Sequence, residues 1–538
     1  MFNELIRLNT DVLVVGSGGA GLRAAIEARK QGVDVLLISK SQTGLANCTA
    51  CALGAFRLAQ GKDEKEKYFQ MVLKAGRYLN NRKLVKILVE NADSAIKELK
   101  ELGVNLEISK RRATIISDKG PAGAVLTKTL TKYIQHLGVK ILSNVMIFDL
   151  VVQENRCVGA LGFHRKTGDI YIISAKSVIL ATGGYSTIYL YHDNPRIITG
   201  DGIALAYLAG AELQDLEFIQ FQPMILDLKI PRMPILDWTI EATKNLVPGG
   251  PLLNVKGEPI LPKYGLLKNK ILRDNLIVAI EREIFEGKGI NNSVILDLRS
   301  VEPEEYNKVF PLEFQQKLIQ PFIKIFKTRR LHIASCAHYT MGGIRINDEC
   351  KTTVKGLYAA GEVTSGVHGA NRLGGNALSE IIVFGAIAGR EAAKYAKQVK
   401  PAEIDKNYIL ESREKAQETF NYSKSKKLNQ AMVKNKVRLV VSSFCRPVRS
   451  KEKLEQALER LEQIKKILPH IVAENFEELR EAFEAKFMFL LAKLVVKSAM
   501  IRTESRGSHF RVDYPKQDDK NWLKNIIVKM EGGETKIR

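Results

Sequence analysis

The chain has 538 residues, of which 45% are hydrophobic and 26% charged, and its formal net charge is +23. This length predicts two or three domains whose cores need no disulfide or metal staples, and the composition is that of an ordinary soluble globular protein. The basic excess would attract an anionic partner, but the lysines are dispersed and no nucleic-acid-binding motif accompanies them. We therefore expect no nucleic-acid function.

The six cysteines lack the density and regular spacing of a secreted disulfide framework, which favours a reducing, intracellular setting. The first twelve residues contain no apolar signal segment and no twin arginine, and the first strand-like run begins about ten residues in. The most apolar late stretch, Phe487–Ile501, is interrupted by two lysines and is shorter than a membrane span. We expect a cytoplasmic protein that reaches the inner face of a membrane only through a partner.

The stretch DVLVVGSGGAGLRAAIEARKQGVDVLLISK begins at Asp11 and has the pattern of a strand, a glycine turn, a helix and a second strand. These elements are predicted at residues 12–15, 22–31 and 33–38. The turn fits the pattern G-x-G-x-x-G with Gly16, Gly18 and Gly21. Such glycines allow a tight turn, the approach of a pyrophosphate and close packing of the helix, so this context predicts dinucleotide binding.

The acid that binds a ribose in an NAD site is missing from the end of the second predicted strand, where Ser39 and Lys40 stand. Two later strand-like runs each end in glycine, where backbone must pass a large ligand. They are SVILATGG, Ser177–Gly184, and VKGLYAAGEV, Val354–Val363. Together these features favour a flavin over a nicotinamide.

These and further motifs give the chain a resemblance to the flavoprotein subunit of the succinate dehydrogenase/fumarate reductase family, which also contains L-aspartate oxidase. The matching stretches run along nearly the whole chain. They include TGDG at Thr199, RDN at Arg273, AHYTMGGI at Ala337, GEVTSGVHGANRLGGNAL at Gly361 and RTESRGSHFRVDYPKQDDKNWLK at Arg502. The resemblance implies an FAD-dependent oxidoreductase that acts on a CH–CH bond beside a carboxylate, in electron transport.

The resemblance also implies an α/β fold. A Rossmann-like FAD-binding domain would carry an inserted α+β capping domain and be followed by a C-terminal helical domain. We place these three domains at 1–218 with 338–397, at 219–337 and at 398–538. Helical spacing of apolar residues in the last segment supports this division. The active site should form where the cap meets the FAD domain, with cap motion as its gate.

Carried over residue by residue, the resemblance implies FAD contacts from Gly16, Gly18, Gly19, Ala20, Gly21, Ser39, Lys40, Asp201, Glu362, Ala377 and Leu378. Asp201 would take over the ribose hydroxyls left without an acid at Lys40, and Glu362 would meet the ribityl chain. Turn capping is the structural alternative for both acids. The histidine that tethers FAD in many relatives falls opposite Cys48, so we predict noncovalent FAD.

Reduction of a C=C bond beside a carboxylate requires a hydride donor, a proton donor and cations that draw charge into the carboxylate. The resemblance assigns the small carboxylate substrate to His338 and Arg372, and the proton to Arg273. Arginine is a weak acid and needs a relay, for which Glu241 and Lys244 are the candidates. The structural alternatives are a buried core histidine for His338, a surface ion pair for Arg372 and a charge at a helix start for Arg273.

At the far end of the substrate the sequence departs from the family pattern, because Gln222 replaces a histidine and Met224 a threonine. A second expected threonine falls on Ile240. A hydrogen bond from a neutral amide stabilises an anion less than a charge-assisted hydrogen bond does. A monocarboxylic enoate is therefore an alternative substrate to fumarate.

Cys48 and Cys51 form a C-x-x-C pair that could exchange electrons with the flavin, although two small cysteines lining a tight site is the simpler interpretation. No second pair is spaced to hold zinc or a cluster, so we expect a separate iron–sulfur subunit to carry electrons. L-Aspartate oxidase activity is a further alternative. Gly342 and Gly343 are expected where backbone passes beside the flavin.

Overall fold

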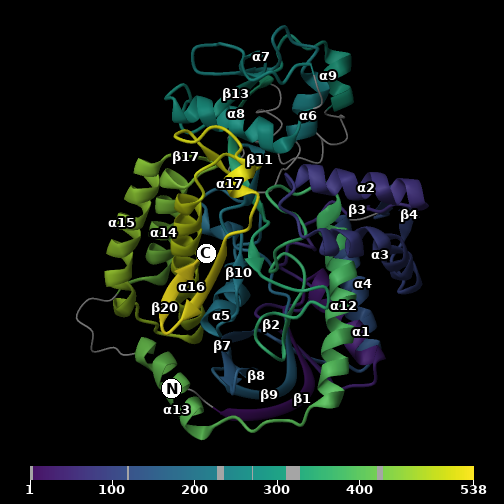
Figure 1. Ribbon diagram of the computed structural model, residues 1–538, viewed down its shortest axis with the longest axis vertical. Coiled ribbons are helices and arrows are strands. Elements are labelled where there is room, and N and C mark those ends of the chain that lie inside the picture. Colours follow the sequence, from purple (N-terminus) through teal and green to yellow (C-terminus); the bar gives the residue numbers. More distant parts are fainter. Residues whose placement is uncertain (1–3, 118–119, 227–235, 269–270, 310–327, 421–427) are drawn as a thin grey trace.

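The computed structural model describes residues 4–117, 120–226, 236–268, 271–309, 328–420 and 428–538 (Figure 1). Its largest sheet has the strand order β6–β2–β1–β9–β8–β7, with β16 paired to β9. The strands β6, β2, β1, β9 and β16 run parallel, whereas β8 is antiparallel to both β7 and β9. Their bounds are β1 Leu5–Val15, β2 Val35–Ser39, β6 Lys140–Ser143, β7 Val145–Gln153, β8 Arg156–His164, β9 Ile170–Leu180 and β16 Leu357–Ala359.

The first strand is longer than the sequence predicts. Residues 5–10 pair with residues 170–175 of β9, and only residues 12–15 are fully buried and apolar. The expectation that strand structure begins about ten residues in was wrong, because a half-buried strand end is stabilised by a partner some 160 residues away. The two runs predicted to end in glycine do form strands, β9 and β16.

Helices cover this sheet, and two of them position the glycine turn. A Cβ at Gly385 of α12 would lie 2.7 Å from the carbonyl oxygen of Ala20 in α1, so the two helices pack more closely than larger side chains would allow. This contact holds the middle of α12 against the start of α1. The helices around the sheet are α1 Gly19–Lys30, α2 Lys62–Ala75, α3 Arg82–Glu101, α4 Ala122–His136, α5 Asp201–Leu208 and α12 Asn376–Gln398.

Residues 219–337 contain a second sheet, in the order β11–β14–β13–β12, and their apolar side chains form a core of their own. Figure 1 shows this part above the large sheet. Its elements are β11 Ile219–Ile225, α6 Leu236–Thr243, β12 Leu252–Leu253, α7 Ile260–Lys263, α8 Arg273–Phe285, β13 Val294–Asp297, α9 Pro303–Val309 and β14 Arg330–Thr340. The capping domain at 219–337 stays a prediction, and its upper boundary falls inside β14, which continues to Thr340.

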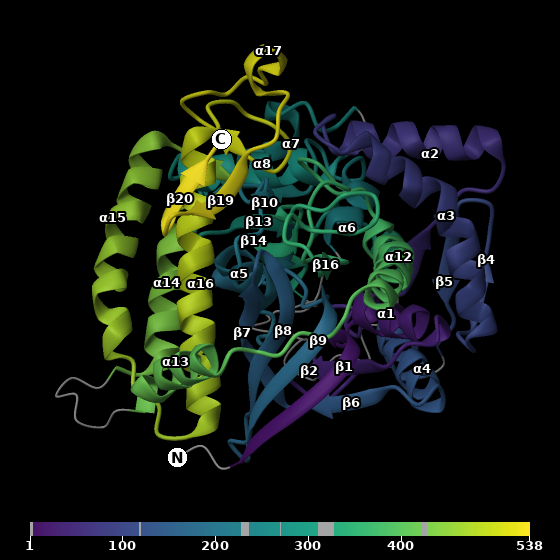
Figure 2. The ribbon, with the colours of Figure 1, turned by 60° about the horizontal axis from the view of Figure 1, so that its bottom comes forward.

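The C-terminal part is dominated by three long helices that lie side by side (Figure 2). The chain then ends in the hairpin β19–β20, whose strand β19 pairs with β10 and contacts α5. The helical prediction omitted this hairpin, because its anchor is the distant strand β10. The elements are β10 Leu213–Gln214, α13 Lys406–Gln417, α14 Gln430–Phe444, α15 Lys451–Ile467, α16 Phe476–Ile501, α17 Asp519–Trp522, β19 Ile527–Glu531 and β20 Glu534–Ile537.

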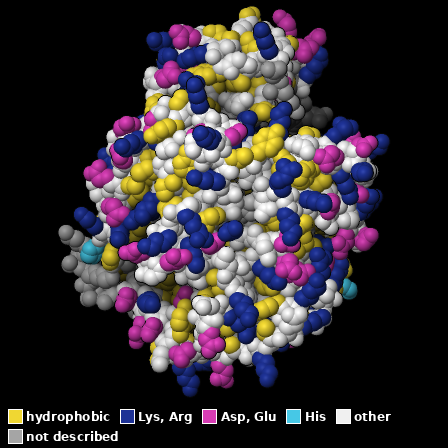
Figure 3. Space-filling view, viewed as in Figure 1, with side chains coloured by type: hydrophobic (Ala, Val, Ile, Leu, Met, Phe, Trp, Pro, Cys, Tyr) yellow, Lys and Arg dark blue, Asp and Glu magenta, His cyan; other side chains and the backbone are white. Residues whose placement is uncertain are grey.

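The surface and the long helices test two expectations from the sequence, that the basic residues are dispersed and that the apolar stretch near the C-terminus does not span a membrane. On the face drawn in Figure 3, lysine and arginine side chains are interspersed with acidic ones rather than gathered in one stripe. Within the described ranges, no helix has both the length and the apolarity that a bilayer crossing demands. The apolar stretch Phe487–Ile501 belongs to α16, most of which is buried against its neighbours.

Candidate functional site

A cavity of about 710 Å³ extends from the glycine turn to the first residue of the cap helix α8. This volume falls within the range of cofactor and small-molecule sites. Its wall is built from segments far apart in sequence: the turn after β1, residues 45–55, the loop 193–201, the start of α12, and several polar side chains at the cap. The cavity therefore has a glycine-rich end and a polar end.

At the glycine-rich end, each glycine of the turn meets a different need. A Cβ at Gly16 would overlap the carbonyl group of Ala181, and one at Gly21 would overlap the carbonyl oxygen of Gly16. A Cβ at Gly18 would meet no atom nearer than 3.8 Å, so the space beside Gly18 is open to a ligand. Because this space adjoins the N-terminus of α1, it suits an anion.

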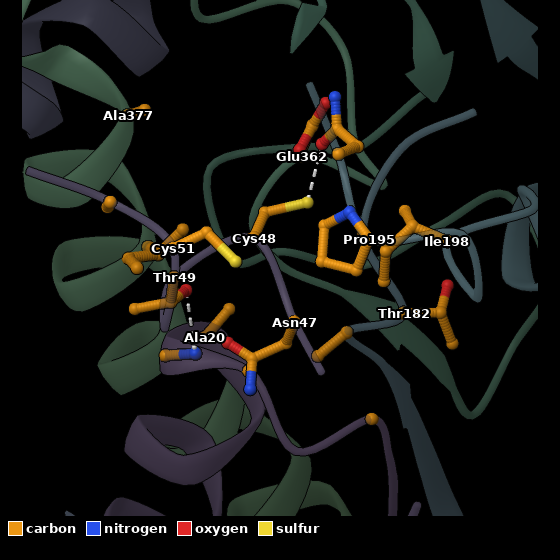
Figure 4. A pocket seen from close by; sticks show the side chains of 18 of the residues that line it. Ala20, Asn47, Cys48, Thr49, Cys51, Thr182, Pro195, Ile198, Glu362 and Ala377 are labelled. Carbon is orange, nitrogen blue, oxygen red and sulfur yellow. Dashed lines mark hydrogen bonds between the residues drawn. The ribbon is translucent and has the colours of Figure 1, made fainter. Parts of the chain in front are cut away.

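The predicted cofactor residues lie on the wall of this cavity, with the exception of Gly21, which packs against the strand. Figure 4 shows one part of the wall, with Thr49 beside Ala20 at the start of α1. The Thr49 hydroxyl accepts the N–H of Gly19 at 3.1 Å, which removes one donor from the anion site.

Lys40 belongs to a buried ion network that joins the wall to the C-terminal helices. Its Nζ lies 2.6 Å from Asp201 and 2.8 Å from Glu484 of α16. Although burial opposes the charge, Lys40, Arg480 and Lys434 hold the pKa of Glu484 at about 2. In the sequence, Lys40 stands where an acid is expected in an NAD site. In the structure, its ion pair with Asp201 holds that side chain in place.

Glu362 and Cys48 lie in the middle of the wall (Figure 4). Glu362 accepts the backbone N–H of Thr340 at 3.0 Å, and burial raises the pKa of Glu362 to about 7. The Cys48 thiol lies 2.7 Å from the side-chain oxygen of Asn194, and burial followed by the charge of Glu362 raises its pKa. A thiol with a raised pKa forms less thiolate, which counts against a dithiol role with Cys51.

The wall fits FAD on three observations. The backbone beside Gly18 is open, and the volume is that of a cofactor site. The N-terminus of α1, the positive end of its dipole, adjoins this open backbone and suits the pyrophosphate of a dinucleotide.

At the polar end, four side chains form one hydrogen-bonded row, Arg372, His338, Asp193 and Gln222. A guanidinium only donates, so Nε2 of His338 accepts from Arg372 at 3.0 Å. The proton of the neutral imidazole therefore lies on Nδ1, which donates to Asp193 at 2.7 Å. Gln222 donates its Nε2 to the same carboxylate. All four residues line the cavity.

Arg372 is a buried cation with an unused donor. Its Nε has no hydrogen-bonding partner among the described residues, and its guanidinium lies over the ring of Tyr339, 4.6 Å from the centroid. Burial and the charge of Arg273 lower the pKa of Arg372 to about 10. Burial also lowers the pKa of His338, although Asp193 opposes the shift. Arg372 and the nearby Arg273 place two positive charges at this end of the cavity, against the one negative charge of Asp193, which suits an anion beside Arg372.

A β-bulge brings His338 into this row. Along the pair β11–β14, Gln220 pairs with Tyr339 and Phe221 with Ala337, so His338 is the extra residue of β14. Bulges change the direction of a side chain, and they are common beside active sites. Gln222 pairs with Cys336 on the same two strands, which places it close to the bulge.

Arg273 opens α8 and lines the cavity, and its charge helps to lower the pKa of His338 and of Arg372. Glu241 and Lys244 form an ion pair of 3.0 Å, and Glu241 also accepts the backbone N–H of Ile271 at 2.8 Å. This pair lies behind the start of α8 and not on the cavity wall. The structure thus brings the predicted relay to the segment that carries Arg273.

The sequence missed Asp193, which no motif marks. It lies in the loop before TGDG, 145 positions before His338, and only the fold brings the two together. The expectation for Gly342 and Gly343 was wrong: a Cβ at either would overlap backbone carbonyl groups, of Asp215 and Val363, and neither lines the cavity. Their small size serves close chain packing.

The two positions that depart from the family pattern beside Gln222 do not reach the cavity. Met224 packs with Ala334 and Cys336 in a small apolar cluster, and Ile240 is fully buried in the core of residues 219–337. Neither could supply the hydroxyl expected for a second carboxylate.

Two family models match the chain, the FAD binding domain over residues 11–378 and the fumarate reductase flavoprotein C-terminal domain over residues 434–538. An uncharacterized FAD-dependent oxidoreductase of Methanocaldococcus jannaschii is 36% identical and covers 97% of this chain and 96% of its own. One fumarate reductase (CoM/CoB) subunit, from Methanothermobacter marburgensis, is 33% identical, with 97% of each chain covered.

The fold is likewise that of solved flavoproteins. A variant of the quinol fumarate reductase protein FrdA of Escherichia coli superposes with a TM-score of 0.87 at 26% identity, covering 99% of this chain and 97% of its own. Sdh1 of Mycobacterium smegmatis superposes with a TM-score of 0.88 at 29% identity, covering 99% and 94%. Both alignments span the large sheet, the cap and the C-terminal helices.

Proposed function

This chain belongs to the fumarate reductase and succinate dehydrogenase flavoprotein family, and on that premise we propose that it reduces an enoic acid or oxidises the saturated product. It is an FAD-dependent oxidoreductase of the type that acts on CH–CH groups. The observation that carries the proposal is Arg372, a buried cation beside His338 with an unmet donor, on the wall of the cavity that holds the glycine turn. Such a group is suited to a substrate carboxylate.

When bound, the flavin supplies the hydride for reduction or accepts it in oxidation. Arg372 binds the substrate carboxylate through its fork of donors. His338 can donate to that carboxylate only if Nε2 takes up a proton, because its existing proton lies on Nδ1. Asp193 stabilises the resulting imidazolium, and the two cations then draw charge out of the double bond as the transition state forms.

Arg273 donates the proton on the carbon that does not receive the hydride. After donation it must be reprotonated, because an arginine without its proton is a strong base. Glu241 accepts the N–H of Ile271, two residues before Arg273, and is paired with Lys244. We assign reprotonation of Arg273 to this pair, because Glu241 binds the backbone two residues before Arg273.

We expect FAD to bind without a covalent bond to the chain. Cys48 lies on the wall where the family's tethering histidine is expected, and its raised pKa disfavours the thiolate that would form a thioether. Acid precipitation of the purified protein should leave all flavin in the supernatant. Yellow colour in a washed, denatured pellet would contradict the expectation, and unfolding in urea followed by gel filtration gives an independent check.

We further propose that electrons arrive through a separate iron–sulfur subunit. Several relatives are named as subunits, among them the fumarate reductase flavoprotein subunit of Escherichia coli, 29% identical over 567 residues. Association with the inner face of a membrane would then be indirect, through such a partner. Co-purification of an iron-containing chain with the native protein tests the proposal, and isolation of a fully active single chain would contradict it.

The test of the reaction is oxidation of a reduced viologen dye by the FAD-loaded protein, with fumarate and monocarboxylic enoates as acceptors. Arg273→Ala should lower kcat at least a hundredfold with FAD content unchanged, because a proton donor is worth 10²- to 10⁴-fold. Arg282→Ala, on the same helix but away from the cavity, should retain activity. Equal loss in both variants, or ammonia release from aspartate as the main activity, would contradict the assignment.

A further inference from the structure

The polar end of the cavity contains a carboxylate whose negative charge would oppose the binding of a dicarboxylate. The Asp193 side chain is 10% exposed and lines the cavity beside Gln222, and it accepts hydrogen bonds from both His338 and Gln222. Its charge also reaches other wall groups, since it is among the causes that raise the pKa of Glu362 and of Cys48. His338 and Gln222 both donate to Oδ2 of Asp193, and Oδ1 accepts the side-chain N–H of Asn194 at 3.2 Å. Among the described residues this leaves one acceptor site of the carboxylate, on Oδ1, for a ligand.

The order of the row defines what lies beyond the carboxylate clamp. From Arg372 the row continues to His338, then to Asp193 and then to Gln222. A substrate carboxylate held by Arg372 and His338 therefore has a negative group as the next neighbour toward Gln222. A second carboxylate at that position would face Asp193 in a buried site, where like charges repel strongly.

Gln222 does not offset this repulsion. It is neutral, it is 2% exposed, and one of its two N–H bonds is already donated to Asp193. Met224 and Ile240, the nearby positions where a hydroxyl is expected from the family pattern, lie in apolar clusters away from the cavity. The Gln222 end thus offers a carboxylate acceptor, one amide oxygen and one amide donor.

We propose that Asp193 selects an enoic acid that carries one carboxylate at the His338–Arg372 end and an uncharged hydrogen-bond donor, such as a primary carboxamide, at the Gln222 end. A carboxylate only accepts hydrogen bonds, so a carboxamide N–H meets Asp193 while the carboxamide oxygen can accept from Gln222. The carboxamide has the shape of a carboxylate without its charge. A carboxylate in the place of the carboxamide has no N–H to donate, so it would bring a second negative charge against Asp193 without a hydrogen bond between them.

This inference rests on the proposed reaction and adds its substrate class. The redox step is unchanged: the C=C bond takes up two electrons from the reduced dye by way of the flavin and two protons, and becomes CH–CH. No bond of the carboxamide breaks. Only the group that faces Asp193 differs between the acceptors.

Three acceptors of nearly the same shape test it: fumarate, its monoamide and its monomethyl ester. They differ at one end only. This end is an anion in fumarate, a neutral hydrogen-bond donor in the monoamide, and a neutral group without a donor in the ester. With the FAD-loaded wild-type protein and reduced methyl viologen, we expect kcat/KM for the monoamide to exceed that for each of the others at least tenfold. The difference should lie mainly in KM, because Asp193 acts on binding at the end away from the reacting clamp.

Asp193→Asn removes the charge and keeps the size of the side chain. We expect the ratio of kcat/KM for the monoamide to that for fumarate to fall at least tenfold in this variant. Asp348→Asn, at a surface ion pair with Lys83, is the matched control and should keep the wild-type ratio. Flavin content and circular dichroism verify folding, and the wild-type ratio tests the inference even if the variant does not load FAD.

Two results would overturn the inference while leaving the proposed reaction in place. One is a wild-type protein that prefers fumarate to its monoamide. The other is an Asp193→Asn variant in which all three acceptors lose activity by one common factor, since Asp193 would then act only by holding His338. Turnover of none of the three by the FAD-loaded protein would instead overturn the proposed reaction, and this inference with it.

Discussion

The two ends of the cavity are built in different ways. The glycine-rich end comes from one continuous stretch, in which the strand β1, the turn and the helix α1 follow each other within 30 residues. The polar end is assembled from a loop, a strand, a bulge and a second loop, which contribute Asp193, Gln222, His338 and Arg372. One end depends on backbone shape and the other on side chains that meet only in the folded chain.

This difference affects how each end can vary. A backbone site tolerates few changes, because the glycine turn must keep its conformation for the strand and helix to pack. A side-chain site can be altered one residue at a time on an unchanged scaffold. Gln222, which stands where the family pattern predicts a histidine, would be a change of this second kind, whereas the fold superposes on solved flavoproteins with TM-scores of 0.87 and 0.88.

The largest expected effect concerns the glycine-rich end. Gly18→Val should reduce bound FAD to below a tenth of the wild-type content and abolish activity, because the side chain would occupy the open space beside the turn. Folding should be preserved, since a Cβ there meets no atom within 3.8 Å. Flavin absorbance after gel filtration and the melting temperature of the FAD-free protein measure the two effects.

Gly21→Ala is the contrasting variant, because its Cβ would overlap the carbonyl oxygen of Gly16. It should lower the melting temperature of the FAD-free protein itself, through a clash between α1 and the strand. If Gly18→Val were the less stable of the two, the distinction between a ligand-facing and a packing glycine would be wrong.

A smaller effect is expected at the polar end. Arg372→Lys keeps the positive charge but loses the planar fork, and we expect kcat/KM for the preferred enoate to fall about a hundredfold, on the order of 3 kcal/mol. FAD content should not change. Arg390→Lys on the helix α12 that follows Arg372, where the arginine is half-exposed beside Glu391, is the control and should leave kcat/KM within twofold of wild type. Loss of FAD in Arg372→Lys would place the residue at the cofactor instead.

The last effect concerns Glu362, between the two ends, and it is an effect on stability. Its pKa in the folded protein is about 7, above the ordinary value of 4.5, because of burial. A raised carboxyl pKa means that its contribution to stability is full below pH 4.5 and is lost as the pH rises through 7, a change of about 3 kcal/mol. Glu362→Gln has no such loss, so the FAD-free variant should gain in melting temperature relative to wild type between pH 5 and pH 8.

Exposed Glu349→Gln serves as the control for this pH series and should follow the wild-type curve. A Glu362→Gln variant whose difference from wild type does not change between pH 5 and pH 8 would contradict the raised pKa. A constant loss at every pH would show that the bond to Thr340 requires a carboxylate.

The success of the sequence predictions follows the same division. The glycine turn, α1 and the strands β9 and β16 were predictable because their signals are local: glycine spacing, apolar runs and helical periodicity. The motifs also led to the family and to FAD, which the family models bear out. The extension of β1 over residues 5–10 and the final hairpin were missed, because each is stabilised by a strand far away in the chain.

For the candidate site, the residues Arg372, His338 and Gln222 came from the motifs, but their relationship did not. The bulge that makes His338 the extra residue of β14 depends on the register of two strands more than 100 residues apart. Asp193 carries no sequence signal, because an acid in a polar loop is usually solvated or caps a turn. Gly342 and Gly343 show the reverse error, in which a motif suggested a ligand and the structure gives a backbone contact.

The sequence by itself determined the dinucleotide turn, the family and the cofactor, since backbone conformation is encoded by neighbouring residues and long motifs are specific. Only the tertiary structure decided that a carboxylate adjoins the proposed substrate clamp and that Lys40 secures Asp201 to the C-terminal helices. The physical reason is that hydrogen bonds and charges act over a few ångströms in space, whatever the separation along the chain. Distances of that kind exist only after folding.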